Sequence, residues 1–121
     1  MDSKPPLERL RSVAVHFLRA ATASVSVEMY RTVVTQAERF PGLSTLFYVE
    51  GLQPIEAKFR MILSLIPNDL HDDPALAADH LLSVLMGGFF SRKLLGAPKH
   101  PADRSLEICV DREIASLLTG A

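Results

Sequence analysis

The 121-residue sequence predicts an all-α protein of about six helices packed as a bundle. Apolar residues recur every three or four positions along successive segments, which is the spacing of one face of a helix. Proline and glycine separate these segments, and no pair of stretches shows the apolar–polar alternation of strands. A chain of this length has little room for a second core, so we expect a single domain over residues 1–121.

The first two predicted helices are amphipathic. One begins near Leu7, after two prolines that a first helical turn tolerates. The second covers residues 26–40 and should end at Pro41, which lacks a backbone donor and disfavours helical geometry in the residue before it. The residues expected to be buried on these two helices are Leu7, Leu10, Ala14, Phe17, Leu18, Ala21, Val27, Tyr30, Val33, Val34 and Ala37.

Two shorter helices should follow, divided at Gly51. The first covers residues 42–50, with Ser44 as its N-cap and Gly51 as the residue that ends it. Pro54 is then well placed in the first turn of the next helix, which Pro67 stops. The residues expected to face inward are Leu43, Leu46, Phe47, Ile55, Phe59, Ile62, Leu63 and Ile66.

The fifth predicted helix begins at Pro74, after Asp73 as N-cap, and ends at Gly96. It is apolar nearly all the way round, so more than one of its sides should be buried. Gly87 and Gly88 interrupt it, although each glycine inside a helix costs about 0.8–1 kcal/mol relative to alanine. The small residues that share a face with them are Ala77, Val84 and Ser91. This face predicts a close helix–helix contact, either with a second molecule or within the monomer.

The last predicted helix covers residues 104–118, after a loop that contains two prolines. Its apolar residues again follow the helical period. They are Leu106, Val110, Ile114, Leu117 and Leu118.

Composition excludes several classes of protein. The 13 Lys and Arg residues against 14 Asp and Glu residues give a net charge of −1, whereas a free-standing nucleic-acid binder carries a basic surplus. The single cysteine, Cys109, excludes an intrachain disulfide and a cysteine-based zinc site. Neither a signal peptide nor 18 consecutive apolar residues occur, so we expect a cytoplasmic protein without a membrane span.

No catalytic motif or cofactor motif is recognisable. The sequence contains neither Gly-x-Ser-x-Gly nor a glycine-rich phosphate loop. Asp69, His71, Asp72 and Asp73 cluster in one loop, but their spacing does not match a calcium loop and is typical of a solvated acidic turn. We therefore expect no enzyme activity, no metal and no cofactor. A small metal-dependent enzyme is the weaker alternative, and divalent-metal binding by this loop would test it.

The large apolar side chains allow two interpretations. Aromatic residues and methionines that converge from several helices can line a cavity for an apolar small molecule, with a Tyr or His to orient it. The alternative is an ordinary hydrophobic core, because any helical domain of this size needs several such residues. The candidate ligand-binding residues are Phe17, Tyr30, Phe47, Phe59, His80, Met86 and Phe89.

Two groups of residues carry a family resemblance. The first group is Tyr30-Arg31, Ala37-Glu38-Arg39-Phe40-Pro41, Leu43 and Phe47-Tyr48, within residues 28–50. The second is Asp73-Pro74, Ala77-Ala78, residues 81–88 and Leu94-Leu95-Gly96. Together they resemble the effector-binding carboxy-terminal domain of TetR-family transcriptional regulators, particularly the AefR-like subgroup.

The resemblance implies a fold, a partner and a function. In that family the last two long helices pair with those of a second subunit in a four-helix interface, and a pocket inside the bundle binds a small, often hydrophobic effector. The dimer-interface residues it implies here are Ala77, Val84, Gly87, Gly88, Ser91, Val110, Ile114 and Leu117. Family members carry a helix-turn-helix domain before the segment that begins at Leu7. This sequence lacks it, so we expect no direct contact with nucleic acid.

We therefore expect the regulatory ligand-binding and dimerisation domain of a TetR-like repressor, forming a homodimer and sensing a small apolar effector. The alternative is a helical dimerisation module that binds no ligand, a headless relative of the family. Stabilisation by apolar compounds would distinguish the two, because only a ligand-binding domain gains stability from its ligand.

Overall fold

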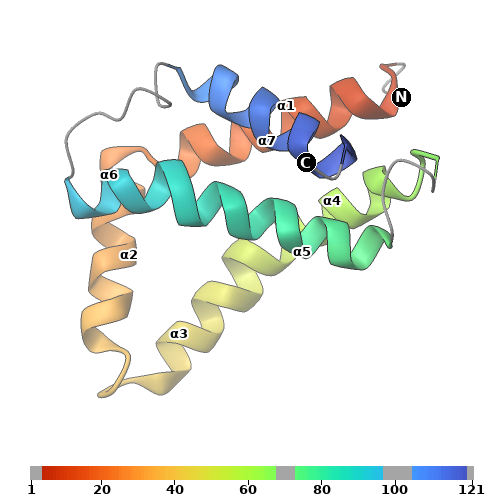
Figure 1. The fold of residues 1–121 in the computed structure, drawn as a ribbon. Coiled ribbons are helices and arrows are strands. Elements are labelled where there is room, and N and C mark those ends of the chain that lie inside the picture. The colour runs from red at the N-terminus through yellow and green to blue at the C-terminus, as the bar shows by residue number, and fades with distance from the viewer. Residues whose placement is uncertain (1–3, 68–72, 97–104, 120–121) are drawn as a thin grey trace.

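A computed structural model describes residues 4–67, 73–96 and 105–119, which form helices joined by short turns (Figure 1). Their bounds are α1 Pro6–Ala21, α2 Ser24–Gln36, α3 Pro41–Phe47, η1 Tyr48–Leu52, α4 Gln53–Leu63, α5 Pro74–Leu85, η3 Met86–Phe90, α6 Ser91–Leu95 and α7 Leu106–Thr119. The elements η1 and η3 are single wide turns of π-helix. No strand occurs in these ranges, so the all-α prediction is confirmed.

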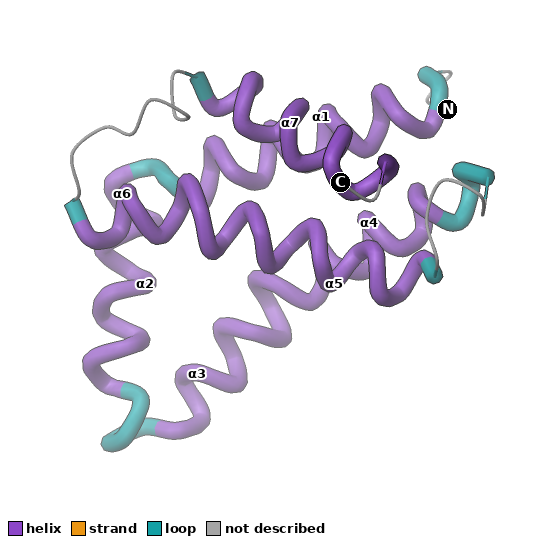
Figure 2. Tube along the Cα trace, in the orientation of Figure 1, coloured by secondary structure: helices purple, strands orange, loops and turns teal. Residues whose placement is uncertain are grey.

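The predicted division at Gly51 is wrong. The chain runs as one unbroken helix from α3 through η1 into α4, and likewise from α5 through η3 into α6 (Figure 2). The described residues thus form five continuous helices instead of six. A proline inside a helix lacks a donor, and its ring crowds the carbonyl four residues earlier. The wide turn of η1 lies directly before Pro54 and gives the helix the irregular geometry that such a proline needs.

Four helices form the bundle, which we define as α1, α4, α5 and α7. Helix α1 packs against α4 and α7, and α5 packs against the same two helices, so the four surround one core. The largest fully buried side chains all come from them: Leu10, Leu18, Phe59, Leu63, Leu81, Leu85 and Val110. Their burial confirms the inward stripes predicted for these helices, apart from Leu7, which is half-exposed at the start of α1.

The arm, which we define as α2, α3 and η1, lies outside the bundle, whereas η3 and α6 continue the bundle helix α5. In Figure 1, α2 and the helix that begins with α3 diverge from the bundle and meet at a turn, so that they form two sides of a triangle. Only Val27 and Val33 are buried on α2, and no residue of α3 or η1 is buried. Val34 and Leu46, predicted to face inward, are more than half exposed, because each arm helix packs along one narrow stripe.

The junction between α2 and α3 also differs from the prediction. Helix α2 ends at Gln36, four residues earlier than expected, and α3 begins at Pro41 with Phe40 as its N-cap. Proline is favoured at the first position of a helix because its fixed φ is already helical. Ser44 therefore lies inside α3 and does not cap it.

The ends of the last two long helices follow the sequence signals. Asp73 caps α5, and its Oδ1 accepts a hydrogen bond from the Ala75 amide at 2.8 Å. Gly96 ends α6 with a φ of +66°, a left-handed conformation that glycine adopts without steric cost. Helix α7 follows Ser105, whose Oγ accepts a hydrogen bond from the Ile108 amide at 3.0 Å.

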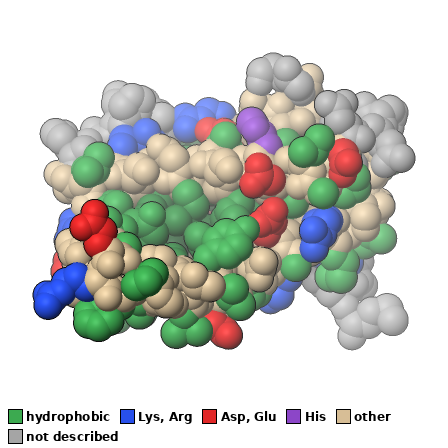
Figure 3. Space-filling view, turned by 90° about the horizontal axis from the view of Figure 1, so that it is seen from below, with side chains coloured by type: hydrophobic (Ala, Val, Ile, Leu, Met, Phe, Trp, Pro, Cys, Tyr) green, Lys and Arg blue, Asp and Glu red, His purple; other side chains and the backbone are tan. Residues whose placement is uncertain are grey.

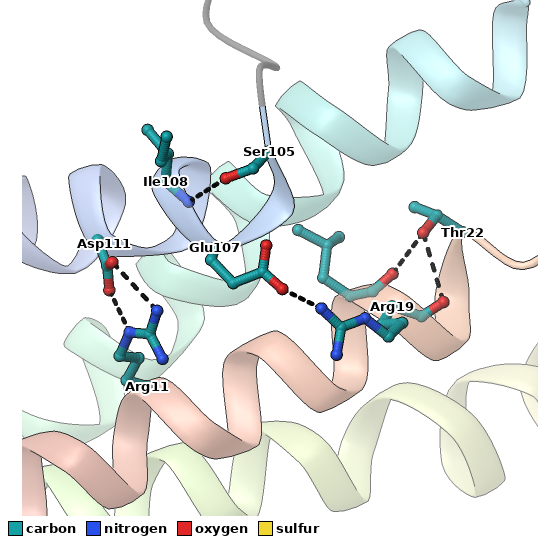
Figure 4. Close-up of polar contacts among 8 residues, drawn as sticks. Arg11, Arg19, Thr22, Ser105, Glu107, Ile108 and Asp111 are labelled. Carbon is teal, nitrogen blue, oxygen red and sulfur yellow. Dashed lines mark hydrogen bonds and ion pairs between the residues drawn. The ribbon is translucent and has the colours of Figure 1, made fainter.

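Ion pairs fix the register of α7 against α1 (Figure 4). Arg11 Nε donates to Asp111 Oδ1 at 2.6 Å, and Arg19 pairs with Glu107. Because the earlier residue of α1 pairs with the later residue of α7, the two helices run antiparallel. The hydrogen bond and the negative charge of Asp111 raise the pKa of the Arg11 guanidinium above its usual value. Because all four side chains are solvent-exposed, the pairs contribute more to register than to stability.

Candidate functional site

An apolar cavity lies where the arm meets the bundle. Its volume is about 190 Å³, and it is partly open to solvent. Its lining comes from α1, α2, α3, η1 and η3, so both wide turns and both regions of the molecule contribute to it. The lining residues are Phe17, Ala20, Ala21, Ser26, Met29, Tyr30, Phe47, Gly51, Leu52, Met86 and Phe90.

Tyr30 connects the elements around the cavity. Its ring centroid lies 5.4 Å from that of Phe47, at an interplanar angle of 72°, and 5.0 Å from that of Phe90, at 78°. Both are edge-to-face contacts, the arrangement that the charge distribution of aromatic rings favours. One side chain of α2 thus contacts α3 within the arm and η3 at the end of the bundle.

Each wide turn presents two residues to the cavity. Gly51 and Leu52 come from η1, and Met86 and Phe90 come from η3. A π-turn inserts an extra residue into a helix and rotates the residues after it, and such turns are frequent at functional sites. The serine after η3 closes this turn, since Ser91 Oγ donates to the Met86 carbonyl at 2.9 Å.

No charged side chain lines the cavity. Its polar side chains are Ser26 and Tyr30, and no described residue hydrogen-bonds either hydroxyl. The nearest cation along the chain, Arg31, pairs with Glu28 and donates to the Leu94 carbonyl near the C-terminal end of α6. This guanidinium therefore connects α2 to α6. The partial negative charge at the C-terminal end of a helix stabilises such a cation.

Seen from below, one face of the molecule shows many hydrophobic side chains (Figure 3). Hydrophobic side chains gather in the middle of that face, between two ridges, and charged side chains lie at its edges.

The structure brings together part of the predicted ligand-binding set. Phe17, Tyr30, Phe47 and Met86 line the cavity. The other three predicted residues do not: Phe59 is fully buried in the bundle core, His80 is exposed on α5, and Phe89 is half-buried beside the cavity residue Phe90.

The predicted set does not include the other lining residues, among them Phe90 and Met29. Phe90 is buried and lines the cavity, whereas its predicted neighbour Phe89 is half-buried and does not line it. Met29 is 54% exposed and lies at the rim, where no burial pattern could identify it.

The predicted dimer-interface residues fall into three groups by exposure. Ala77, Val110 and Ile114 are buried in the core of the monomer. Val84, Gly88, Ser91 and Leu117 are half-buried, and Gly87 is exposed. A Cβ at Gly87 would meet no described atom within 4 Å, whereas one at Gly88 would lie 3.7 Å from the Arg92 guanidinium. Open space for a close neighbour therefore exists at Gly87.

Some of the exposed residues on the last two long helices recur at the same spacing. On α5 and η3 these are Leu76, His80, Ser83 and Gly87, and on α7 they are Ile108, Arg112, Ala115 and Thr119, whereas Ala75, Asp79 and Asp111 are exposed outside these two sets. Successive members are four, three and four residues apart, which is the spacing of a helix–helix seam. The helix from Pro74 to Leu95 is long and apolar enough to cross a membrane by length and composition, yet only 33% of its most apolar window is buried.

Further candidate residues are those that could bind a metal ion or act as a reactive thiol. Residues 4–67, 73–96 and 105–119 contain no group of three or more His, Cys, Asp or Glu side chains that could hold a metal ion. The predicted acidic cluster of Asp69, His71 and Asp72 lies outside these ranges. Cys109 is 2% exposed, as expected of a small apolar residue in the core.

Comparison with known proteins identifies one family. The family described as AefR-like transcriptional repressor, C-terminal domain, matches residues 8–119, which is nearly the whole chain. No curated protein and no solved structure matches.

Proposed function

The chain belongs to the family of AefR-like transcriptional repressor C-terminal domains, and on this premise we propose that it is the effector-binding and dimerisation domain of a TetR-type repressor. Membership confirms the resemblance seen in the sequence. In this proposal the chain is one regulatory domain that acts in the cytoplasm, catalyses no reaction, needs no cofactor, and binds neither nucleic acid nor membrane itself. It senses a small apolar molecule and pairs with a second copy of itself.

The observation that carries the effector part of the proposal is the apolar cavity between arm and bundle. A molecule bound there contacts α2, α3 and η1 on one side and α1 and η3 on the other. Its affinity therefore depends on how the arm lies against the bundle, and by the same free energy its binding shifts the population of arm positions. A cavity enclosed by one rigid element would offer no such coupling.

The dimer part of the proposal rests on the two exposed stripes. Ser83, Gly87 and Ala115 are small, so the backbones of a second copy can approach closely there. Part of this long apolar helix, including Leu76 at 67% exposure, is accessible in the monomer, and a second copy would remove that surface from water. Ala77, Val110 and Ile114 of the same two helices are buried in the monomer core. The proposed seam therefore uses the exposed stripes on these helices instead.

Gly87→Trp tests the seam. Wild-type protein at tens of micromolar should sediment as a dimer in analytical ultracentrifugation. The bulky indole should separate the two copies and give a monomer that keeps its helical circular dichroism, because the added side chain meets open space in the monomer. Gly42→Trp is the matched control, since Gly42 is also an exposed helical glycine with open space and lies on α3, far from the stripes.

A monomeric wild-type protein would contradict dimerisation. A Gly87→Trp protein that remains as dimeric as Gly42→Trp would place the interface elsewhere. The competing interpretation, a dimerisation module without a ligand, shares the seam but leaves the cavity without a function. It would be favoured if no apolar compound raised the Tm.

A further inference from the structure

We propose that the cavity at the junction of arm and bundle selects uncharged molecules with a single aromatic ring and about eight to ten non-hydrogen atoms. This inference rests on the proposed function, because it names the chemical class of the effector that the cavity would bind. Three properties of the site carry it: its size, its lack of charge and its aromatic lining.

The size of the cavity limits the ligand to one ring. An apolar protein cavity of about 150 Å³ is known to accommodate benzene, and the cavity here measures about 190 Å³. The additional space admits a substituent of two to four atoms on the ring. Drug-sized ligands usually occupy pockets of about 300–1,000 Å³, so this cavity encloses one substituted ring and not a molecule with several rings.

The charge of the lining excludes ionised ligands. No Lys, Arg, His, Asp or Glu side chain lines the cavity, and Arg31 is held by Glu28 and by the Leu94 carbonyl. A carboxylate or ammonium group that enters would lose its hydration without gaining an ionic partner. Aromatic faces can attract cations, but no carboxylate is present to support one, so a neutral molecule is favoured over both.

The lining itself favours an aromatic ring. Four rings contribute to it, those of Phe17, Tyr30, Phe47 and Phe90, together with the thioethers of Met29 and Met86. Rings in edge-to-face contact and sulfur atoms at ring edges attract a further ring more strongly than an aliphatic group of equal size. The uncommitted hydroxyls of Ser26 and Tyr30 can meet one hydroxyl or amide group on the ligand.

Methionine methyl resonances offer a direct test. In protein labelled with ¹³C at the methionine methyl groups, Met29 and Met86 report on the cavity, and Met61, exposed on α4 outside it, is an internal control. Benzyl alcohol, benzylamine and benzoate have nearly the same size and differ in charge at neutral pH. Benzyl alcohol should shift the Met29 and Met86 resonances without moving Met61, with an affinity at least about tenfold higher than either charged compound.

The outcomes separate failure of this inference from failure of the proposed function. If benzoate or benzylamine shifts Met29 and Met86 as readily as benzyl alcohol, the selectivity for neutral ligands is wrong while the cavity remains a binding site. If cyclohexylmethanol binds as tightly as benzyl alcohol, the aromatic preference is wrong. If neither these compounds nor larger apolar ones move the two resonances, the cavity is not an effector site and the proposed function fails as well.

Filling the cavity provides the second measurement. Ala21→Leu adds three carbon atoms to a half-buried residue of the lining, and Ser26→Leu adds apolar bulk from α2. Either substitution should abolish the benzyl alcohol shifts. Ala57→Leu makes the same chemical change at an exposed position of α4 and should leave them unchanged. Unchanged binding by both filled variants would place the ligand outside this cavity.

Discussion

The bundle and the arm both carry large apolar side chains but pack very differently. Every one of the largest fully buried side chains lies on the bundle helices, whereas α3 and η1 bury no residue and α2 buries two. Val25, Met29 and Leu46 of the arm are more than half exposed although they are large and apolar. Apolar content alone therefore does not determine which helices form the core. What decides it is how extensively a helix packs against its neighbours.

The difference explains where the cavity lies. Each bundle helix packs extensively against two other helices of the bundle, and the four close around their core. Helix α2 contacts α1, α3 and α6 less extensively, and α2 and α3 meet each other at a turn (Figure 1). The cavity therefore lies at the junction and not among the fully buried side chains of the bundle. A region held by few buried contacts opens at lower free energy than the core and can change position when a ligand binds.

The largest expected contrast is between two phenylalanines. Phe59→Ala removes a fully buried ring from the bundle core and should lower the free energy of unfolding by about 3–5 kcal/mol. Phe47→Ala removes a half-buried ring whose main aromatic partner is Tyr30, and should cost only about 1–2 kcal/mol. Urea denaturation monitored by circular dichroism measures both. Equal losses would show that the arm is packed as firmly as the bundle.

A smaller contrast lies between two glycines of the long helix that runs from α5 through η3 to the end of α6. Gly96→Ala places a Cβ at a φ of +66° and should destabilise the protein by about 1–2 kcal/mol. Gly87→Ala adds a Cβ in open space at a glycine without a positive φ, and should stabilise the monomer by up to about 1 kcal/mol. Thermal unfolding should therefore shift in opposite directions. A loss of stability in Gly87→Ala would show that η3 requires glycine for its wide turn.

Local signals in the sequence predicted most of the fold. The cap at Asp73, the end at Gly96 and the core stripes of α1 and α4 depend on neighbouring residues and on a regular period, so they can be identified without tertiary information. The arm was predicted less well. Burial of Val34 depends on whether a second helix covers that side of α2, and nothing within α2 specifies this.

The two wide turns account for the main errors. Gly51 and Pro54 together indicate a helix end, but a π-turn lets the helix continue through both residues. In η3, which is the same kind of turn, Phe90 lines the cavity and the predicted Phe89 does not. A pattern with a fixed period of 3.6 residues cannot anticipate an inserted residue. The cavity was thus predicted through Tyr30 and Phe47, which lie on regular helix, and less well at its edges.

Hydrogen exchange with and without benzyl alcohol tests the central claim, that a mobile arm and a firmly packed bundle enclose an effector cavity. Amides of α2 and α3 should exchange much faster than those of α1, α4 and α5, because they open locally without global unfolding. Benzyl alcohol should slow exchange in α2, α3 and η1 and leave the centre of the bundle unchanged. Equal protection of arm and bundle without ligand, or equal slowing in both regions when it is added, would contradict the account.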